Sequence, residues 1–290
     1  MAEKIYTSQF AQLLPNVFAQ EQYFLNSFGG SLQVADGITN SDTFMKMKIS
    51  DTDVVLQEYS TDENVAFGTG TEGTNRFGPR KEVKSIDTDV AYDAPLAIHE
   101  GVDNFTVNDN ANQVIEERSQ LHAEAWNNRL STELGKALSD NASQTIESTE
   151  VAEVFADARK AFVDAKLNKN ITWRAYVTPE VYNIIVDNKL TTTAKNSSAN
   201  IDNQEIVKFK GFVVEELPTE YFQEGENVLF VVDNIGVVGV GVEIYRIFDA
   251  HDFYGVTIQG AGKYGKYIPE KNKQGILKAN VTLEPVTEGV

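Results

Sequence analysis

The sequence contains no cysteine and only three histidines among its 290 residues. Disulfide bonds and thiolate metal ligands are therefore excluded. His99, His122 and His251 are too far apart in the sequence to form a paired ligand motif such as HExxH, and each is more simply explained as a polar surface or core residue. No serine lies in a pattern that resembles a nucleophile elbow. We therefore expect no catalytic residue, no cofactor and no bound metal.

Basic residues are scarce, and long apolar runs are missing. Lysine and arginine total 25 against 43 aspartates and glutamates, which gives a formal net charge of −18. Sequence-specific nucleic-acid binding is disfavoured, because such proteins carry a basic footprint. No stretch approaches the roughly 18 apolar residues of a membrane-spanning helix, and no early apolar run has the length of a signal peptide. We expect a soluble protein that is made in a cytoplasm and has no membrane partner.

Two glycine patterns of the form GxGxxG occur, at residues 68–73 and 260–265. A dinucleotide-binding site needs such glycines between a strand and the first turn of a helix. The first pattern lies in a polar stretch that no helix follows. After the second pattern, Pro269 and the sequence KNKQG stand where the phosphate-binding helix should begin. Neither pattern therefore predicts a nucleotide site.

A long amphipathic helix is the clearest feature that the sequence does contain, over residues 108–139. Asn108 and Asp109 are candidate N-caps, and Gly135 is the only glycine in the stretch. Charged residues, Glu116, Glu117, Arg118 and Arg129 among them, are expected on wetter faces. The spacing of the apolar residues predicts one buried stripe, made by a row of every fourth residue and by residues on adjoining rows: Trp126, Leu130, Leu134 and Leu138, with Val114, Ile115, Leu121 and Ala125.

Two extended segments precede this helix, at residues 41–60 and 83–92. Met45–Ile49 alternates with period two, and Val54-Val55-Leu56 continues as a β-favouring run. The segments are joined by a long polar stretch rich in glycine, threonine and asparagine, which is unusual inside a compact domain. We expect a hairpin that projects from the body. Since a lone two-stranded ribbon is only marginally stable, it would become stable by lying on another surface.

The tip of this hairpin is basic in an otherwise acidic chain. Two readings remain open: a solvated turn, or a tip that docks on the acidic surface of a neighbouring molecule, with two phenylalanines as apolar anchors. The candidate inter-subunit contact residues are Phe67, Arg76, Phe77, Arg80, Lys81 and Lys84.

Residues 1–40 hold too many aromatic residues for a solvated tail, and Pro15 and Gly29-Gly30 divide them into short pieces. They form an arm that packs either on its own domain or across a neighbour. The aromatic residues in question are Phe10, Phe18, Tyr23, Phe24 and Phe28.

A mixed α/β region follows the long helix, after a polar break, SDNASQTIEST. We expect helices at residues 151–167 and 179–190, the second opened by Pro179, and a flexible loop at TTTAKNSSAN. Strands are expected at residues 173–177, 206–216 and 228–240. Strand patterns return over residues 243–285, with turns at AGKYGKYIPEKNKQG and a final strand at residues 276–283.

This order of parts resembles the major capsid proteins of tailed bacteriophages, which share the HK97-type fold. Residues 229–279, LFVVDNIGVVGVGVEIYRIFDAHDFYGVTIQGAGKYGKYIPEKNKQGILKA, look like the C-terminal region of capsid proteins from phages of Gram-positive hosts. The helix opener TPEVYNIIVDNKL is similar to a segment of their A-domains. The likeness lies in organisation over the whole chain, because the family has no catalytic signature to match.

The resemblance implies an α+β fold with four parts: an N-terminal arm (1–40), an E-loop hairpin (41–107), a P-domain with the spine helix (108–147 and 250–290), and a mixed α/β A-domain (148–249). The apolar stripe of the spine helix would pack on a P-domain sheet made partly by residues 253–285. Met1 begins almost directly at the arm, so any scaffolding protein is expected to be a separate chain.

The implied function is that of a structural subunit of an icosahedral capsid. Copies of the chain would assemble with one another into hexamers and pentamers, in the host cell cytoplasm, and become part of the virion. The implied partners are a scaffolding protein, a portal and packaged double-stranded DNA, the last held only by non-specific proximity. Two alternatives remain: an encapsulin-like bacterial compartment shell, and an α/β enzyme or ligand-binding protein with its site in residues 148–249.

Overall fold

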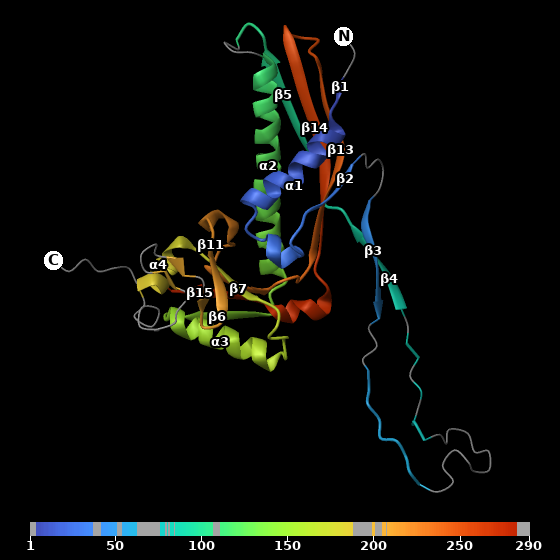
Figure 1. Cartoon of the computed structure of the whole chain (residues 1–290), viewed down its shortest axis with the longest axis vertical. Helices are drawn as coiled ribbons and strands as arrows, with labels where there is room; N and C mark the ends of the chain where they lie inside the picture. The colour runs from blue at the N-terminus through green and yellow to red at the C-terminus, as the bar shows by residue number, and fades with distance from the viewer. Residues whose placement is uncertain are drawn as a thin grey trace, which may run out of the picture. The chain divides into compact units, whose positions relative to one another are not determined.

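The computed structural model describes residues 4–36, 42–50, 54–62, 76–78, 80, 82–83, 85–106, 111–187, 199–200, 205–206 and 208–282. The chain divides into two compact units (Figure 1). The smaller unit is Asp42–Ala91, and the larger unit comprises Met1–Ser41 with Tyr92–Val290.

The larger unit is organised around α2 (Ala111–Asp140), the predicted long helix. Trp126, Leu130, Leu134 and Leu138 are all buried, so the predicted row is confirmed. Leu121 is 46% exposed and Ala125 is exposed, so their assignment to the stripe was wrong. At 100° per residue Leu121 lies about 140° around the helix from Trp126. The buried face instead takes in small and polar residues beside the row: His122, Ala123, Asn127 and Ser131.

The N-terminal half of α2 packs on a long antiparallel sheet of β5 (Leu96–Asp103), β14 (Gly255–Tyr267) and β13 (Val237–Asp249). Short strands β1 (Lys4–Ile5) and β2 (Gln33–Asp36) both pair with β13, β1 antiparallel and β2 parallel. The Trp126 and Tyr264 rings meet edge to face at 5.1 Å, and Tyr264 Oη donates to Trp126 O at 2.8 Å. Figure 1 shows α2 running along this sheet.

The glycines of the second GxGxxG pattern lie inside β14. The predicted turn at AGKYGKY was therefore wrong. Its glycines serve packing instead, because a Cβ on Gly262 would lie 2.9 Å from the Trp126 ring and 2.6 Å from Gly241 O. The first pattern lies outside the described residues. The turn sequence does begin after β14, where η3 (Glu270–Gly275) leads into the last strand.

A second sheet of six strands has the order β10-β11-β7-β12-β15-β6. Its strands are β10 (Lys208–Phe209), β11 (Phe212–Glu216), β7 (Trp173–Val177), β12 (Val228–Val232), β15 (Ile276–Val281) and β6 (Gln144–Ser148). Helices α3 (Val151–Asp164) and α4 (Pro179–Asp187) begin where predicted. The Phe155 ring packs edge to face against Phe209, Phe212 and Phe230.

Several strand predictions in this region need correction. The predicted polar break contains β6, a mostly exposed edge strand that pairs in parallel with β15. Residues 228–240 are two strands, because Asn234 has a positive φ of 59° in the turn between β12 and β13. The predicted strand 206–216 is instead divided into short strands at 205–206 (β9, Glu205–Ile206), 208–209 and 212–216, with a turn at Lys210 and Gly211 between the last two. The TTTAKNSSAN loop lies mostly outside the described residues, which include β8 (Ala199–Asn200) at its end.

The two sheets cut across the expected boundary between residues 148–249 and 250–290. Strand β13 pairs with β14 in the long sheet, whereas β15 lies between β12 and β6 in the six-stranded sheet. The chain therefore crosses between the sheets at residues 233–236 and again through η3. As expected, β14 packs against the apolar stripe of α2. Strand β15, which was expected in the same sheet, instead belongs to the six-stranded sheet.

The described part of the N-terminal stretch packs on its own chain. Helix α1 (Thr7–Glu21) contains Pro15 without ending there, and η1 (Leu25–Phe28) follows it. The Phe10 ring stacks on Tyr245 with centroids 4.2 Å apart, and Ser27 Oγ shares a 2.6 Å hydrogen bond with Tyr176 Oη. Tyr23 stays 40% exposed, but the other four predicted aromatic residues are buried: Phe10, Phe18, Phe24 and Phe28.

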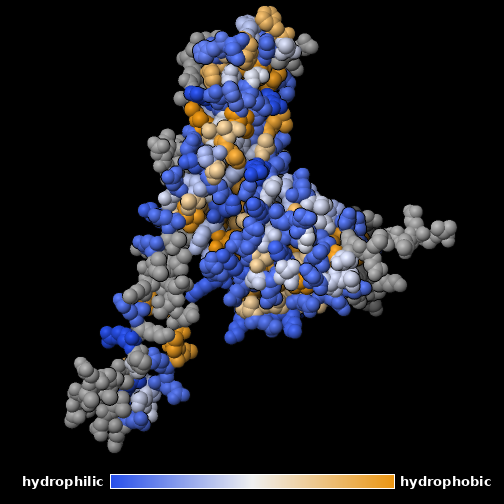
Figure 2. All heavy atoms as spheres, turned by 180° about the vertical axis from the view of Figure 1, so that it is seen from behind, coloured by the Kyte–Doolittle hydropathy of each residue, from blue (hydrophilic) through white to orange (hydrophobic). Residues whose placement is uncertain are grey.

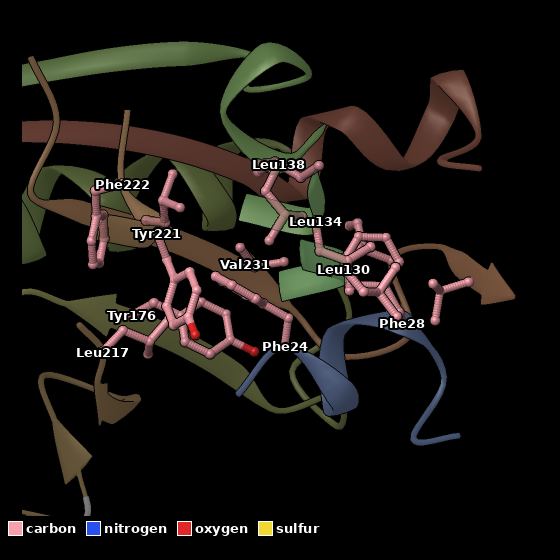
Figure 3. Close-up of a cluster of buried hydrophobic side chains, with 14 of the residues drawn as sticks. Phe24, Phe28, Leu130, Leu134, Leu138, Tyr176, Leu217, Tyr221, Phe222 and Val231 are labelled. Atoms are coloured by element: carbon pink, nitrogen blue, oxygen red, sulfur yellow. The ribbon is translucent and has the colours of Figure 1, made fainter. Parts of the chain in front are cut away.

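The core is continuous between the sheets at the C-terminal half of α2. Figure 3 shows Leu130, Leu134 and Leu138 of α2 gathered with Phe24 and Phe28, and with side chains of the six-stranded sheet and of the η2 region (η2, Thr219–Tyr221). Gly135 belongs to this junction, because a Cβ there would lie 2.4 Å from Tyr221 O. One helix thus holds the N-terminal segment and both sheets together.

The smaller unit is the predicted hairpin. Strands β3 (Thr43–Ser50) and β4 (Ser85–Ala91) pair antiparallel, with Met45 opposite Val90 and a register irregularity between Thr43 and Met45. The pairing is confirmed, but the strands end earlier than predicted. Residues 54–62 are not in a strand.

Candidate inter-subunit surfaces

Beyond β3 and β4, residues 57–62 and 76–78 contact each other. Ser60 N donates to Arg76 O at 3.0 Å, and the Tyr59 and Phe77 rings meet edge to face at 5.1 Å. Gly78 has a φ of +76°, and a Cβ there would lie 2.3 Å from the Gln57 side chain. Residues 57–62 and 76–78 therefore pack against each other.

These segments expose large apolar side chains. Val54 is 91% exposed, Leu56 is 94% exposed and Phe77 is 77% exposed. Single exposed apolar residues are ordinary, but here several occur within the one small unit Asp42–Ala91. We call this set the hairpin surface: Val54, Val55, Leu56, Tyr59, Phe77 and Val83.

The structure describes half of the predicted contact residues. Arg76, Phe77 and Arg80 lie near one another in the sequence at the return of the hairpin, and Arg76 Nη2 donates to Asp62 O at 3.5 Å. Phe67, Lys81 and Lys84 lie outside the described residues. The prediction missed Val54, Leu56 and Tyr59. A signal was present in the sequence, because Val54-Val55-Leu56 breaks the alternation that a half-buried strand would show.

A charged network joins α2 to β5. Arg118 donates from Nε to Glu100 Oε2 at 2.8 Å and pairs with the other carboxylate oxygen. His122 Nε2 lies 2.8 Å from Glu100 Oε2, and its Nδ1 lies 3.0 Å from Tyr245 Oη. The Arg118 hydrogen bond holds the pKa of Glu100 below its usual range, although partial burial opposes the shift. Arg118 is therefore engaged within its own chain.

A second network lies in the six-stranded sheet. The Arg174 guanidinium on β7 pairs with Glu215 and with Asp233, the second through Nη2 to Oδ2 at 3.2 Å. Burial raises the pKa of Glu215, and the Arg174 charge counteracts part of that shift. Tyr176 beside it is fully buried, and burial raises the pKa of its phenol. The partly buried charges of Arg174, Glu215 and Asp233 are paired with one another, and the Tyr176 hydroxyl is paired with Ser27.

The remaining candidates for chemistry are isolated from one another. His99 and His251 are exposed, and His122 is only 3% exposed inside the network on α2. Among the described residues, no three His, Cys, Asp or Glu side chains are grouped to hold a metal ion. In the same part of the chain, no helix is long and apolar enough to cross a membrane.

Two open hollows border α3. The first, of about 560 Å³, is lined in part by Ser143, Asp157 and Lys160. Ser143 Oγ donates to Ile276 O at 3.0 Å, so that hydroxyl is engaged with the backbone. The second, of about 400 Å³, lies at the start of β7 and is lined by Arg159, Lys169 and Lys208. Neither hollow joins a nucleophile to a base.

The face drawn in Figure 2 is largely hydrophilic, with hydrophobic side chains in small separate groups. Association through that face would have to combine polar and apolar contacts, as non-obligate interfaces do.

No protein-family model matches the chain, and no curated protein sequence matches it. Solved structures do match over nearly its full length. A chain from Mycobacterium phage Che8 is 15% identical, with a TM-score of 0.60, and the match covers 98% of this chain and 94% of that one. A chain from the mature capsid of bacteriophage PhiM1 is 10% identical, with a TM-score of 0.62 and coverages of 91% and 88%.

A chain from the capsid of Ralstonia phage GP4 gives the same result, at 10% identity, a TM-score of 0.58 and a coverage of 92% of each chain. These matches include α2 and both sheets, since they span almost the whole sequence. They show a common fold at identities too low to show more. The chain therefore has the α+β fold of tailed-phage major capsid proteins, the HK97-type fold.

Proposed function

We propose that this chain is the structural subunit of a phage capsid, which assembles with copies of itself into hexamers and pentamers and encloses double-stranded DNA. The observation that carries the proposal is the near full-length match to chains from solved phage capsids. The expected arm (1–40), E-loop (41–107), P-domain (108–147 with 250–290) and A-domain (148–249) would then correspond to the parts of that fold, with two shifts of boundary: β5 and β13 go with the P-domain sheet, and β15 goes with the A-domain sheet. A closed shell sums many modest contacts over a symmetric assembly.

The hairpin surface supports this proposal physically. A two-stranded ribbon alone is marginally stable in water, and this one leaves apolar side chains exposed on both of its segments. Covering one fully exposed valine or leucine stabilises by about 1.5–3 kcal/mol before the costs of association. Covering Val54, Leu56 and Phe77 together would therefore favour docking on a neighbouring subunit.

Charge supports the same arrangement. Arg76 and Arg80, with Lys81 and Lys84 in the sequence, place basic groups at the return of the hairpin in a chain of net charge −18. An acidic neighbouring copy would attract that basic end and fix its register. The net negative charge would also keep the shell from adsorbing the packaged DNA tightly, because affinity for DNA backbone comes from cationic side chains.

The proposed partners follow from this function. They are further copies of the chain, a separate scaffolding protein, a portal, and DNA in non-specific proximity. Assembly would take place in the host cell cytoplasm, and the product would be the virion capsid.

The hairpin provides the test. Val54→Ser with Leu56→Ser removes apolar area from exposed positions, so the monomer should fold as before but fail to form shells. Deleting residues 64–78 should have the same outcome. The matched control is Glu58→Ser with Thr61→Ser, which alters two exposed polar residues of the same segment and should leave assembly intact. Circular dichroism verifies folding, and sedimentation velocity with electron microscopy measures assembly.

Normal shells from both the double variant and the deletion would contradict the docking role of the hairpin. Shells that enclose a protein cargo instead of DNA would point to a bacterial compartment. A compact monomer whose melting temperature rises with a small ligand would favour a binding protein.

A further inference from the structure

The hollow at the start of β7 is basic in an acidic chain. Its charged lining residues are Arg159 on α3, Lys169 on the following loop and Lys208 on β10, and its lining includes no acidic side chain. Lys169 and Lys208 are exposed, and neither forms an ion pair with any residue that the structure describes. We call this hollow the basic groove. Three cations together without a carboxylate in the lining repel one another unless a counter-charge neutralises them.

The basic groove is also a built surface with apolar walls. Arg159 Nη1 donates to Lys210 O at 3.2 Å, which fixes the guanidinium at the groove. Gly211, at a φ of +98°, forms the turn beside it. The walls include Val163, which is 45% exposed, and Ile171, which is 40% exposed. A fitting occupant therefore carries carboxylates next to an aliphatic side chain.

Helix α4 presents that combination. Glu180, Ile184 and Asp187 are spaced by four and three residues, which places them on one face of the helix. All three are exposed, Ile184 by 38%. Neither acidic residue forms an ion pair within the described residues. We call this set the α4 face.

We propose that the α4 face of one copy of this chain docks in the basic groove of the next copy, as a head-to-tail contact of the six-stranded sheet regions. The contact rests on the proposed shell function, and it deepens that function by naming the two surfaces that meet. Because the two surfaces are different, the contact is heterologous, and repeating it closes a ring when the rotation between copies allows. Complementary charge sets the register, and the aliphatic side chains exclude water between them.

DNA is the less suitable occupant. Phosphates would neutralise Arg159, Lys169 and Lys208, but they offer no carbon surface to Val163 and Ile171. A hollow of about 400 Å³ also suits side chains that enter it better than the outward curve of a duplex.

Charge reversal on each surface tests the contact. The groove variant is Lys169→Glu with Lys208→Glu, and the α4 variant is Glu180→Lys with Asp187→Lys. All four positions are exposed, so each variant should fold. Each alone should need at least about tenfold more protein for half-maximal association, because each places like charges face to face. A chain with all four substitutions keeps the net charge of the natural protein and should recover association.

Mixing the two variants gives the sharpest readout. The reversed groove of one complements the reversed α4 face of the other, and the natural pair also remains complementary. Association should therefore return in a 1:1 mixture, in rings where the two proteins alternate. Such rings have even numbers of copies, so native mass spectrometry should find hexamers and no pentamers. The charge control is Lys136→Glu with Lys160→Glu, two exposed lysines outside the basic groove.

The outcomes separate the two proposals. If the single-surface variants associate like the natural chain, the groove contact is wrong and the shell function stands. If the groove variant associates normally but loses affinity for a fluorescent DNA duplex, the groove belongs to nucleic acid. If the natural chain stays monomeric at every concentration, both alone and with a scaffolding partner, both the contact and the shell function fall.

Discussion

Single residues set how closely the parts of the larger unit approach one another. Glycine is a poor helix former, costing about 1 kcal/mol relative to alanine in a helix interior, yet Gly135 lies inside α2. The backbone oxygen of Tyr221 lies 2.4 Å from the position where a Cβ would be. The missing side chain is thus what allows the η2 segment to lie directly on the helix.

Gly135→Ala should therefore destabilise the protein, although alanine favours the helix. We expect the free energy of unfolding to fall by about 1–3 kcal/mol, the usual cost of overpacking, in urea titrations followed by circular dichroism. Lys136→Ala, at the next and exposed position, should change it by less than about 0.5 kcal/mol. A Gly135→Ala protein more stable than the natural one would contradict the close approach.

The ionisation of Glu100 on β5 is coupled to the packing of α2, because its carboxylate pairs with Arg118 on that helix. The hydrogen bond from Arg118 lowers its pKa in the folded state. A lowered folded-state pKa means a contribution to stability that is present above the unfolded value, about 4.3 for glutamate. That contribution is lost as the pH falls through the folded-state pKa.

Glu100→Gln should accordingly lower the free energy of unfolding at pH 7 and matter less as the pH falls below about 4. Urea unfolding of the variant and of the natural protein, at pH 7 and at pH 3, measures this difference in the free energy of unfolding. Glu116→Gln is the control, since Glu116 is an exposed glutamate on α2, the helix that Glu100 contacts. An effect of Glu100→Gln that stays constant from pH 7 to pH 3 would show that ionisation is not its cause.

At the scale of elements, periodicity predicted those whose burial is one-sided. The row Trp126, Leu130, Leu134 and Leu138 of α2 is buried. Strand β7 also lies at residues 173–177 as predicted, but it is buried on both faces, so it does not show one-sided burial. Leu121 shows the limit of this reasoning. An apolar residue near a stripe is not necessarily on it, because the buried side of α2 also accepts His122 and Asn127, whose partners come from other elements.

Leu134→Ala should lower the free energy of unfolding by about 2–5 kcal/mol, because it opens a cavity at the junction of α2 with the six-stranded sheet. Leu121→Ala should change it by less than about 0.5 kcal/mol. Thermal and urea unfolding of the two variants measure the contrast directly. Equal losses at both positions would mean that Leu121 belongs to the buried stripe.

Two predictions failed where the same residue types are typical of both strands and loops. Strand β6 is polar because it is an exposed edge strand, and such strands look like loops. The glycines in β14 look like turn residues, but Gly262 is small because Trp126 lies over it. The crossing of β15 into the six-stranded sheet depends on long-range pairing with β12 and β6, which no local pattern encodes.

The candidate surfaces were predictable only in part. The basic return of the hairpin was visible as a local charge reversal at Arg76 and Arg80. The basic groove was not visible, because Arg159, Lys169 and Lys208 come from three separate elements. The exposure of Val54 and Leu56 required knowing where β3 ends. Which residues share a surface depends on which elements lie side by side in the fold, more than on the spacing of those residues in the sequence.

At the scale of the whole molecule, the two units differ in how far their apolar side chains are buried. The larger unit has one core, in which α2 connects the N-terminal segment with both sheets. The hairpin Asp42–Ala91 is a separate unit with exposed apolar side chains. Such exposed apolar side chains do not stabilise an isolated chain. In a subunit that binds copies of itself, covering these side chains stabilises the assembly.

Electron microscopy of the expressed protein, alone and together with a scaffolding partner, is the measurement that decides whether the chain is a shell subunit. We expect closed shells in which the chain forms hexamers and pentamers. Sedimentation velocity should then show large particles in place of a monomer. A chain that remains a compact monomer with and without that partner, while correctly folded by circular dichroism, would contradict the proposal that it is a shell subunit.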